Sequence, residues 1–250
     1  MTKIFNRNIT DALLFFVALA VIWEVSIAVF DIKSYILPSL GDIAVAFWQS
    51  WDVLMQNSVI TLGEVLLGFV SAVILGVAIS LLIYFIPVAK RTLYPFMIAL
   101  QSIPKIGLAP IIVVWFGYGL SSKVIMAFLF AFFPIVIATL GGLAGIPAHL
   151  EEHFRALRSS TWNTFWRLRV PSALPSFIDG CKVAMPLAVI GAIVGEFVGS
   201  NDGLGNLILM ATGSSQTALT FAALAAVTTL SLVLFYIIEL MGRLVWWRSN

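Results

Sequence analysis

The sequence predicts an all-α membrane protein with six transmembrane helices, and two properties of the chain lead to this fold class. Hydrophobic residues make up 61% of the 250 residues and charged residues only 10%, and the mean hydropathy is +1.05. A water-soluble domain has about 25% charged residues, so this chain cannot cover a water-facing surface. Its long apolar runs also lack the alternation of period two that marks barrel strands, which leaves helices as the spanning elements.

A helix needs about 20 apolar residues to cross the hydrocarbon core of a bilayer. The segments that reach or approach that length are 12–30, 65–86, 93–116, 124–146, 183–199 and 218–241. Glu24 interrupts the first of them, and Pro104, Lys105 and Pro110 break the third. No linker or internal repeat separates the segments, so we expect a single transmembrane domain over residues 1–250.

The connection between the first two spans predicts either a short amphipathic helix or a plain extension of the second span. Ser39 followed by Asp42 is typical of a capped helix start. Apolar residues recur beyond it at helical spacing, at Ile43, Phe47, Trp51 and Leu54. Trp48 and Trp51 suit the level of the lipid headgroups, so an interfacial helix is one of the two interpretations.

The distribution of lysine and arginine predicts the orientation in the membrane, because cytoplasmic loops carry an excess of both. One set of ends and loops holds Lys3, Arg7, Lys90, Arg91, Arg155, Arg158, Arg167, Arg169, Arg243 and Arg248. The alternate loops hold only Lys33 and Lys123. We therefore expect both termini, and the segment that holds four of these arginines, to face the cytoplasm.

That polar segment, residues 147–175, predicts a structured loop of two short helices. Glu151 and Glu152 would lie in the first turn of a helix opened by a proline, where negative charge is favourable. Residues 159–161 offer a break and a new N-cap. A second amphipathic helix follows, and we expect it to end at Pro171. Such a loop either binds a partner in the aqueous phase or is held by lipid headgroups.

Intramembrane charges indicate where a path through the protein lies. A charge at the bilayer centre costs about 2.5–3.5 kcal/mol, so it usually faces a cavity or a partner. Lys105 lies in a helix broken by prolines, which is typical of backbone that lines an internal space. We expect Lys105 and Glu196 to line or gate a translocation path, with Gln101, Ser102 and Thr139 as secondary candidates. The equal alternative is that these groups pair with polar neighbours and fix helix packing.

Three glycines, Gly191, Gly195 and Gly199, repeat every four residues in the fifth apolar segment. This spacing allows the close approach of another helix. Either a dimer contact or packing within one subunit would account for it.

The chain offers no constellation for catalysis, metal binding or nucleic-acid binding. The single Cys181 excludes an intramolecular disulfide and a cysteine metal cluster. His149 and His153 lie four residues apart without a third ligand nearby, and the basic residues form no dense patch. The chain also lacks the Gly-x4-Gly-Lys-Ser/Thr phosphate-binding loop. We expect no catalytic residue, no metal and no cofactor in this chain, and no ATP hydrolysis by it.

A set of short motifs co-occurs along most of the chain at characteristic spacing. The motifs are Ile103-Pro104-Lys105 through Pro110, Trp115-Phe116-Gly117-Tyr118-Gly119, Ser122-Lys123, Phe132-Phe133-Pro134-Ile135, Gly142-Leu143, Trp162 to Pro171 with Pro175, Gly195-Glu196 and Gly203-Leu204-Gly205. On these residues the sequence resembles the membrane permease subunit of bacterial ABC importers, in the branch that carries sulfonates, taurine, nitrate and pyrimidine vitamin precursors. A weaker match covers Pro38 and the stretch from Thr61 to Phe69.

The resemblance implies a type I importer fold in the bacterial inner membrane and a set of partners. They are two ATPase subunits that bind ATP and Mg, a second permease subunit (an identical copy or a divergent paralogue), an external substrate-binding protein and membrane lipid. The short helix of the polar segment would then insert into a groove of the ATPase. The residues that the resemblance assigns to this coupling are Glu151, Glu152, His153, Phe154, Arg155, Leu157, Arg158, Ser160 and Trp162.

The polar segment departs from the pattern of the family at several positions. The family loop reads Glu-x-Ala-(x)3-Gly, whereas this chain has Glu152-His153-Phe154 and then Arg158 where the glycine belongs. A left-handed turn costs a residue other than glycine roughly 1–2 kcal/mol. We therefore expect a turn of different shape, or one shifted toward Ser159. Glu64 also stands where the family usually has a basic residue.

Two further functions compete with the importer subunit. An ion-coupled secondary transporter would use Glu24, Lys105 and Glu196 as its coupling groups. A non-transporting scaffold would require neither broken helices nor intramembrane charge. The lack of visible inverted repeats and the large polar segment favour the importer subunit over the secondary transporter.

Overall fold

The computed structural model describes residues 2–244, and every regular element in that range is a helix. The side chains of Lys3 and Arg7, and Arg248 as a whole, lie outside the described part. Five of the described helices are long and apolar enough to cross a membrane, and a sixth span results if one bent pair is counted as a single span. The predicted all-α membrane fold is confirmed.

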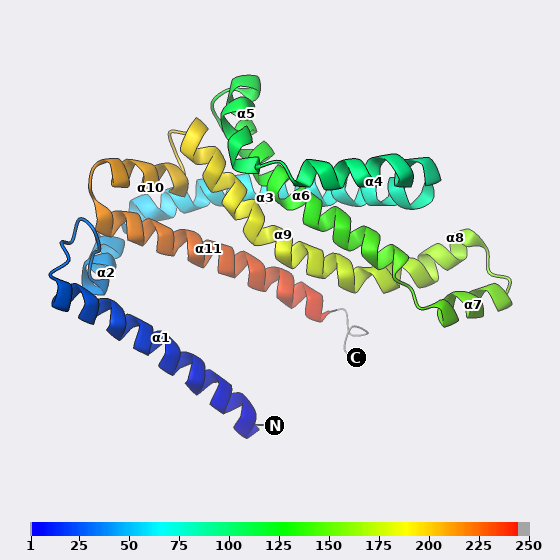
Figure 1. Cartoon of the computed structure of the whole chain (residues 1–250), viewed down its shortest axis with the longest axis horizontal. Coiled ribbons are helices and arrows are strands. Elements are labelled where there is room, and N and C mark those ends of the chain that lie inside the picture. Colours follow the sequence, from blue (N-terminus) through cyan, green and yellow to red (C-terminus); the bar gives the residue numbers. More distant parts are fainter. Residues whose placement is uncertain (1, 245–250) are drawn as a thin grey trace.

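The longer helices run side by side as one bundle (Figure 1). They are α3 (Trp51–Phe85), α4 (Pro87–Gln101), α6 (Leu120–Ala144), α9 (Val170–Gly199) and α11 (Thr217–Arg243). The short helices α2 (Leu40–Gln49) and α10 (Leu204–Gly213) lie at one end of this bundle, which we call the α10 end. The helices α7 (Ala148–Ala156) and α8 (Thr161–Thr164) project from the opposite end, which we call the α7 end.

Small residues allow α9 to pack closely against α6 at the centre of the core. A Cβ atom added to Gly191 would lie 2.6 Å from the carbonyl oxygen of Met126, and one added to Gly195 would lie 2.9 Å from the Cα atom of Lys123. A Cβ atom at Gly199 would meet Val113 at 2.7 Å. The glycine repeat is therefore explained by packing within one subunit.

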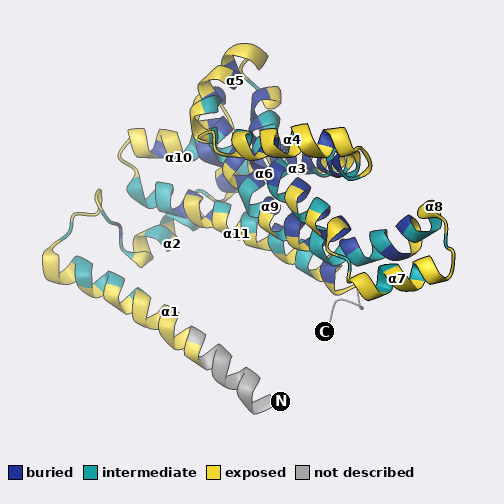
Figure 2. Cartoon of the chain, turned by 45° about the vertical axis from the view of Figure 1, so that its right-hand side comes forward, coloured by how far each residue is buried: buried dark blue, intermediate teal, exposed yellow. Residues whose placement is uncertain are grey.

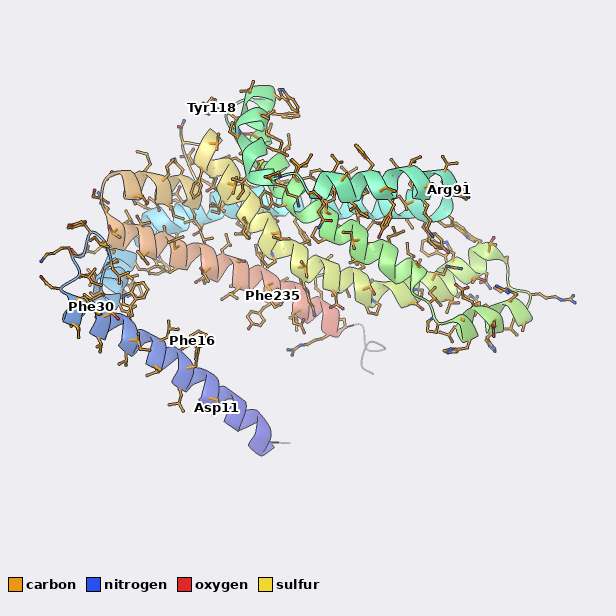
Figure 3. All side chains as sticks on the ribbon, viewed as in Figure 1. Asp11, Phe16, Phe30, Arg91, Tyr118 and Phe235 are labelled. Carbon is orange, nitrogen blue, oxygen red and sulfur yellow. The ribbon has the colours of Figure 1, made fainter. Side chains whose placement is uncertain are left out.

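Helix α1 (Thr2–Phe30) diverges from the bundle, and its described side chains are largely exposed (Figure 2). Figure 3 shows Phe16 projecting from a stretch of α1 that no other ribbon covers. The helix is attached near its end: the indole Nε1 of Trp23 donates to the carbonyl oxygen of Pro38 at 3.1 Å, and Glu24 accepts from the backbone N–H of Leu40 at 2.7 Å. Glu24, the charge that interrupts the first span, thus binds the start of α2.

Helix α2 is a separate element and not an extension of α3. Ser39 and Asp42 form a full capping box at its start, as the sequence predicts. The helix ends at Gln49, and α3 begins after the break at Ser50. Trp48 lies across the break from Trp51, and their rings stack with centroids 5.7 Å apart.

The third span is broken, as predicted. Helix α4 ends at Gln101, and the following pair, a 3₁₀ turn over Lys105–Leu108 and helix α5 (Ala109–Phe116), is bent by 89° from it. Figure 1 shows α5 standing away from the axis of α4. Pro104 before the 3₁₀ turn and Pro110 in the first turn of α5 remove two amide donors, which accounts for the break.

The expected helix end at Pro171 is wrong, because α8 continues into α9 without a break. The helix runs from Thr161 to Gly199 and makes the fifth span much longer than the apolar run over 183–199. A π-helical turn over Phe165–Arg169 lies just before the proline, and the backbone N–H of Val170 bonds to the carbonyl oxygen of Phe165. Such a turn changes the local hydrogen-bond pattern, so that a proline next to it no longer ends the helix.

Candidate functional site

The turn between α7 and α8 keeps a left-handed residue at the position where the sequence has arginine. Arg158 has a φ of 50°. Its N–H donates to the carbonyl oxygen of Arg155 at 3.0 Å, and the N–H of Ser159 donates to that of Phe154 at 3.1 Å. This pair of bonds is the Schellman ending of a helix. The expectation of a changed or shifted turn is wrong, because these two bonds hold Arg158 in the strained conformation.

The next helix starts at a side-chain cap. The Ser160 hydroxyl accepts from the backbone N–H of Asn163 at 3.2 Å, and the Asn163 side chain donates to the Ser159 hydroxyl at 2.9 Å. The N-cap predicted within residues 159–161 is therefore confirmed at Ser160.

Aromatic packing attaches the polar segment to the end of α3. Phe165 is buried, and its ring centroid lies 5.0 Å from that of Phe85 and 6.3 Å from that of Tyr84. Leu143 and Ala173 complete this small apolar cluster. The polar segment is thus fixed on the bundle and is not a loose connection.

Arg169, the last residue of the π turn, forms a second attachment. Its guanidinium lies 2.9 Å from the carboxylate of Glu151 on α7 and donates to the carbonyl oxygen of Leu143 at 3.4 Å. It also stacks over the ring of Tyr84 at 5.2 Å. Neither Arg169 nor Tyr84 is among the residues predicted for this site. The signal in the sequence was the spacing of Arg169 from Phe165, which puts both on one helix face.

Most of the residues predicted for coupling point away from the bundle. The exposed members are Glu152, His153, Arg155, Leu157, Arg158, Ser160 and Trp162. Glu151 and Phe154 are half-buried and turn toward the bundle. Glu151 and Phe154 also line a hollow of about 490 Å³ between the polar segment and α3, together with Tyr84, Phe85 and Arg169. The structure thus gives the polar segment an outer face that a partner can reach and an inner face that the bundle holds.

A buried ion pair lies toward the α10 end of the bundle. Lys123 on α6 pairs with Glu64 on α3, and the two side chains are 7% and 1% exposed. Lys123 also donates to the hydroxyl of Ser200 at 3.0 Å. The assignment of Lys123 to a loop is therefore wrong: the residue lies in the first turn of α6 and inside the protein. The pair also explains why an acidic residue is tolerated at position 64.

Glu196 belongs to a second buried polar cluster beside this pair. Its carboxylate accepts from the hydroxyl of Thr61 at 2.6 Å and from the backbone N–H of Gly205. The Thr61 hydroxyl in turn accepts from the backbone N–H of Leu204 at 2.9 Å. Helix starts leave backbone donors without partners inside the helix, and here α3 and α9 supply those partners for α10.

A hydrogen bond between Asn57 and Gly203 extends this buried polar cluster. The side-chain oxygen of Asn57 accepts from the N–H of Gly203 at 2.7 Å. Gly203 has a φ of +100°, and a Cβ atom added there would overlap the carboxylate of Glu196. Position 203 therefore needs glycine both for its backbone and for its space.

Lys105 lies at the bend of the broken span, half-buried and over two aromatic rings. Its ammonium is 4.9 Å from the ring centroid of Phe133 and 5.5 Å from that of Phe130. Gln101 and Ser102 at the same bend are exposed. These three residues of the expected path lie together on one open part of the subunit.

The other two path candidates lie elsewhere. Thr139 is buried in α6, where its hydroxyl donates to the carbonyl oxygen of Ile135 at 2.6 Å. Glu196 lies in the cluster at the start of α10, where its polar partners are Thr61 and Gly205, whereas Lys105 lies over Phe130 and Phe133. Their role in a path stays a prediction.

The chain matches known proteins over most of its length. Residues 65–246 match the family described as "Binding-protein-dependent transport system inner membrane component". The chain is 42% identical over 193 residues to the formylaminopyrimidine transport permease protein ThiX of Halalkalibacterium halodurans, which covers 77% of each chain. It is 36% identical over 235 residues to the riboflavin transport system permease protein RibX of Chloroflexus aurantiacus, covering 93% of this chain and 88% of that one.

A solved structure shares the fold. The chain is similar to a chain from inward-facing structures of the MetNI methionine ABC transporter, with a TM-score of 0.62 and 22% identity, covering 81% of this chain and 98% of that one. At this level of identity the likeness shows the fold alone.

Proposed function

Because the chain belongs to the family of binding-protein-dependent transport system inner membrane components, we propose that it is the transmembrane subunit of an ATP-driven importer for a small solute. The observation that carries this proposal beyond the family is the shape of the polar segment. Its outer face is exposed, and its inner face is fixed to α3 by Phe165 and Arg169. A segment built in this way can receive a force from a cytoplasmic partner and pass it to the membrane helices.

We assign that force to two ATPase subunits, which would bind ATP and Mg and close on nucleotide binding. Helix α7 would lie in a groove of the ATPase, with its exposed charged and apolar side chains as the contact. The unbroken helix from Thr161 to Gly199 would carry the movement across the bilayer. This arrangement requires the α7 end to face the cytoplasm. Both termini would then face the cytoplasm as well, since α1 begins and α11 ends toward that end (Figure 1).

The translocation path would lie on the open part of the subunit around the broken span. Gln101, Ser102 and Lys105 would face it, and a second permease subunit, either an identical copy or a paralogue, would supply the other wall. Residues 1–250 act in this proposal as one transmembrane domain.

The solute would be delivered at the α10 end by an external binding protein. The relatives are named for the transport of formylaminopyrimidine, riboflavin and aliphatic sulfonates. We propose a solute of this kind, a small vitamin precursor or a sulfonate. An ion-coupled secondary transporter is the alternative function.

Native mass spectrometry of the gently purified complex tests the proposal. The importer predicts two ATPase chains bound to two permease chains, and the masses show whether both permeases are this chain. Proteoliposomes of that complex are then assayed with each of the named solutes, with the binding protein supplied and with or without internal ATP. Uptake by a species that holds no ATPase would establish the secondary transporter instead.

A further inference from the structure

We propose that Arg169 is a positioning residue that makes α7 move as one body with the membrane helices. The inference rests on the proposed function, because it concerns how a push on α7 reaches the bundle. The inference is based on three contacts of the Arg169 side chain and on the position of Arg169 in the chain.

Arg169 joins four elements through one side chain. It lies at the end of the π turn that leads into α9. Its guanidinium reaches Glu151 on α7, the carbonyl oxygen of Leu143 near the end of α6, and the ring of Tyr84 on α3. The planar guanidinium suits this task, because it bonds in its plane through several N–H groups while its face stacks on an aromatic ring. A lysine ammonium offers no such combination.

Helix α7 turns the half-buried Phe154 toward the bundle, but its polar attachment rests on one side chain. Within the described part of the chain, the ion pair between Glu151 and Arg169 is the polar side-chain contact that joins α7 to the π turn. The covalent link to α8 runs through the turn at Arg158, whose backbone is in the left-handed region. Residues 145–147 join the other end of α7 to α6, so a push on α7 would flex both chain connections unless a side-chain contact resists it. Arg169 supplies that contact.

The π turn itself is held at both of its ends. Phe165 at its first residue packs on Phe85, and Arg169 at its last residue stacks on Tyr84. Turns of this kind occur mostly as single insertions in α-helices and often at functional sites. Both ends of the turn are tied to α3, so the distorted stretch is braced and can carry a load from α7 into α9.

Tyr84 and Arg169 also lie beside two hollows. Both residues line the hollow of about 490 Å³ under the polar segment and another of about 520 Å³ between α3, α4 and α6. Removal of the guanidinium would leave Glu151 without its partner and take one lining group from both hollows. The loss would fall on the junction between the polar segment and the bundle, and not on the outer face of α7.

The test compares Arg169→Met with Arg167→Met in the complete complex of permease and ATPase. Arg167 lies in the same π turn, but its side chain is exposed and makes no hydrogen bond or ion pair in the described structure, so it controls for the loss of a charge. Both changes are made in a chain that carries Gln101→Cys at the bend of the broken span; the native Cys181 is buried. The measured quantity is the change in the rate of maleimide labelling on adding ATP, divided by the rate of ATP hydrolysis.

We expect Arg169→Met to lower this ratio by about fivefold to tenfold, as changes along a coupling route do, and Arg167→Met to leave it unaltered. A ratio for Arg169→Met equal to that of the unaltered complex overturns the inference while the importer proposal stands. A complex in which ATP alters no labelling overturns the importer proposal, and the inference falls with it.

A second pair of variants keeps the inference testable if Arg169→Met does not fold. Glu151→Gln alters only the half-exposed partner on α7, and it should lower the ratio as Arg169→Met does. The exchanged pair Glu151→Arg with Arg169→Glu should restore part of the ratio, because it rebuilds the contact between α7 and the π turn. An exchanged pair no better than either single change would count against a specific contact.

Discussion

Lys123 on α6 and Glu64 on α3 form an ion pair inside the protein, although hydropathy places the first at a loop and the second within a span. Each charge is far from bulk water, and each is tolerated because the other is present. Ser200 at the end of α9 accepts from the same ammonium, so the pair lies where three helices meet. Glu64 is thus half of a pair that fixes helix packing.

Breaking this pair should cost far more than removing it. Lys123→Met leaves the Glu64 carboxylate buried without its partner, and we expect a loss of about 3–5 kcal/mol in the free energy of unfolding. The double variant with Glu64→Leu should regain most of that loss, because the unpaired Glu64 carboxylate is then removed as well. Thermal unfolding of the purified protein in detergent, carried out for each variant of a double-mutant cycle, measures the loss and the regain of stability. A loss in the double variant equal to the sum of the losses of Lys123→Met and Glu64→Leu alone would show that the two side chains act independently.

Arg158→Gly should stabilise the turn between α7 and α8. Arg158 holds a left-handed backbone that costs an arginine roughly 1–2 kcal/mol and costs glycine almost nothing. Hydrogen exchange over residues 148–164 should slow in the variant. Arg158→Ala is the matched control, because alanine removes the side chain but keeps the strain. A similar gain in the control would assign the effect to the side chain and not to the backbone.

The membrane spans could be predicted from the sequence because a bilayer demands long apolar helices. The capping box at Ser39 could be predicted because capping depends on residues that are close in the chain. The burial of Lys123 could not be predicted from the sequence, since its partner Glu64 comes from a distant part of the chain and only helix packing brings the two residues together. The helix through Pro171 was missed because a π turn has no clear local signal. Arg169 was missed for a different reason: its three partners lie on three other helices, and only the packing of the helices brings them to it.

The residues predicted for coupling also include features that the sequence predicts correctly and one that it does not. Their exposure followed from the polar character of the segment, and the left-handed turn was the one feature that the missing glycine put in question. The turn forms nonetheless, because its two backbone hydrogen bonds close around Arg158 whatever the side chain. Local geometry can thus survive a residue that local preference disfavours, at a cost in stability.

Gly203→Ala should destabilise the α10 end of the bundle. An added Cβ atom would overlap the Glu196 carboxylate, and the backbone there has a positive φ, so we expect a loss of about 1–3 kcal/mol. Gly213→Ala at the other end of the same helix is the control, since a Cβ atom there meets nothing within 4 Å. Thermal unfolding of the two variants tests this. Equal stability of both would mean that the turn can shift away from Glu196.

Lys105 and Glu196 should respond differently to removal, because one lies at an open bend and the other inside a bonded cluster. Glu196→Ala leaves the buried donors of Thr61 and Gly205 unpaired, at about 1–3 kcal/mol each, so the amount of folded protein should fall. Lys105 is held only over aromatic rings in the described structure, so Lys105→Ala should leave that amount nearly unaltered.

Solute uptake per folded molecule then separates a role in the path from a role in packing. We expect Lys105→Ala to lower it by about fivefold or more, because the substitution removes a cation at the bend where the path is proposed. Lys90→Ala is the control, since Lys90 is an exposed cation on α4 whose side chain makes no hydrogen bond or ion pair in the described structure. Uptake and protein level are measured separately for each variant in proteoliposomes of the complete complex. Unaltered uptake per folded molecule in both Lys105→Ala and Glu196→Ala would exclude the two residues from gating and leave packing as their role.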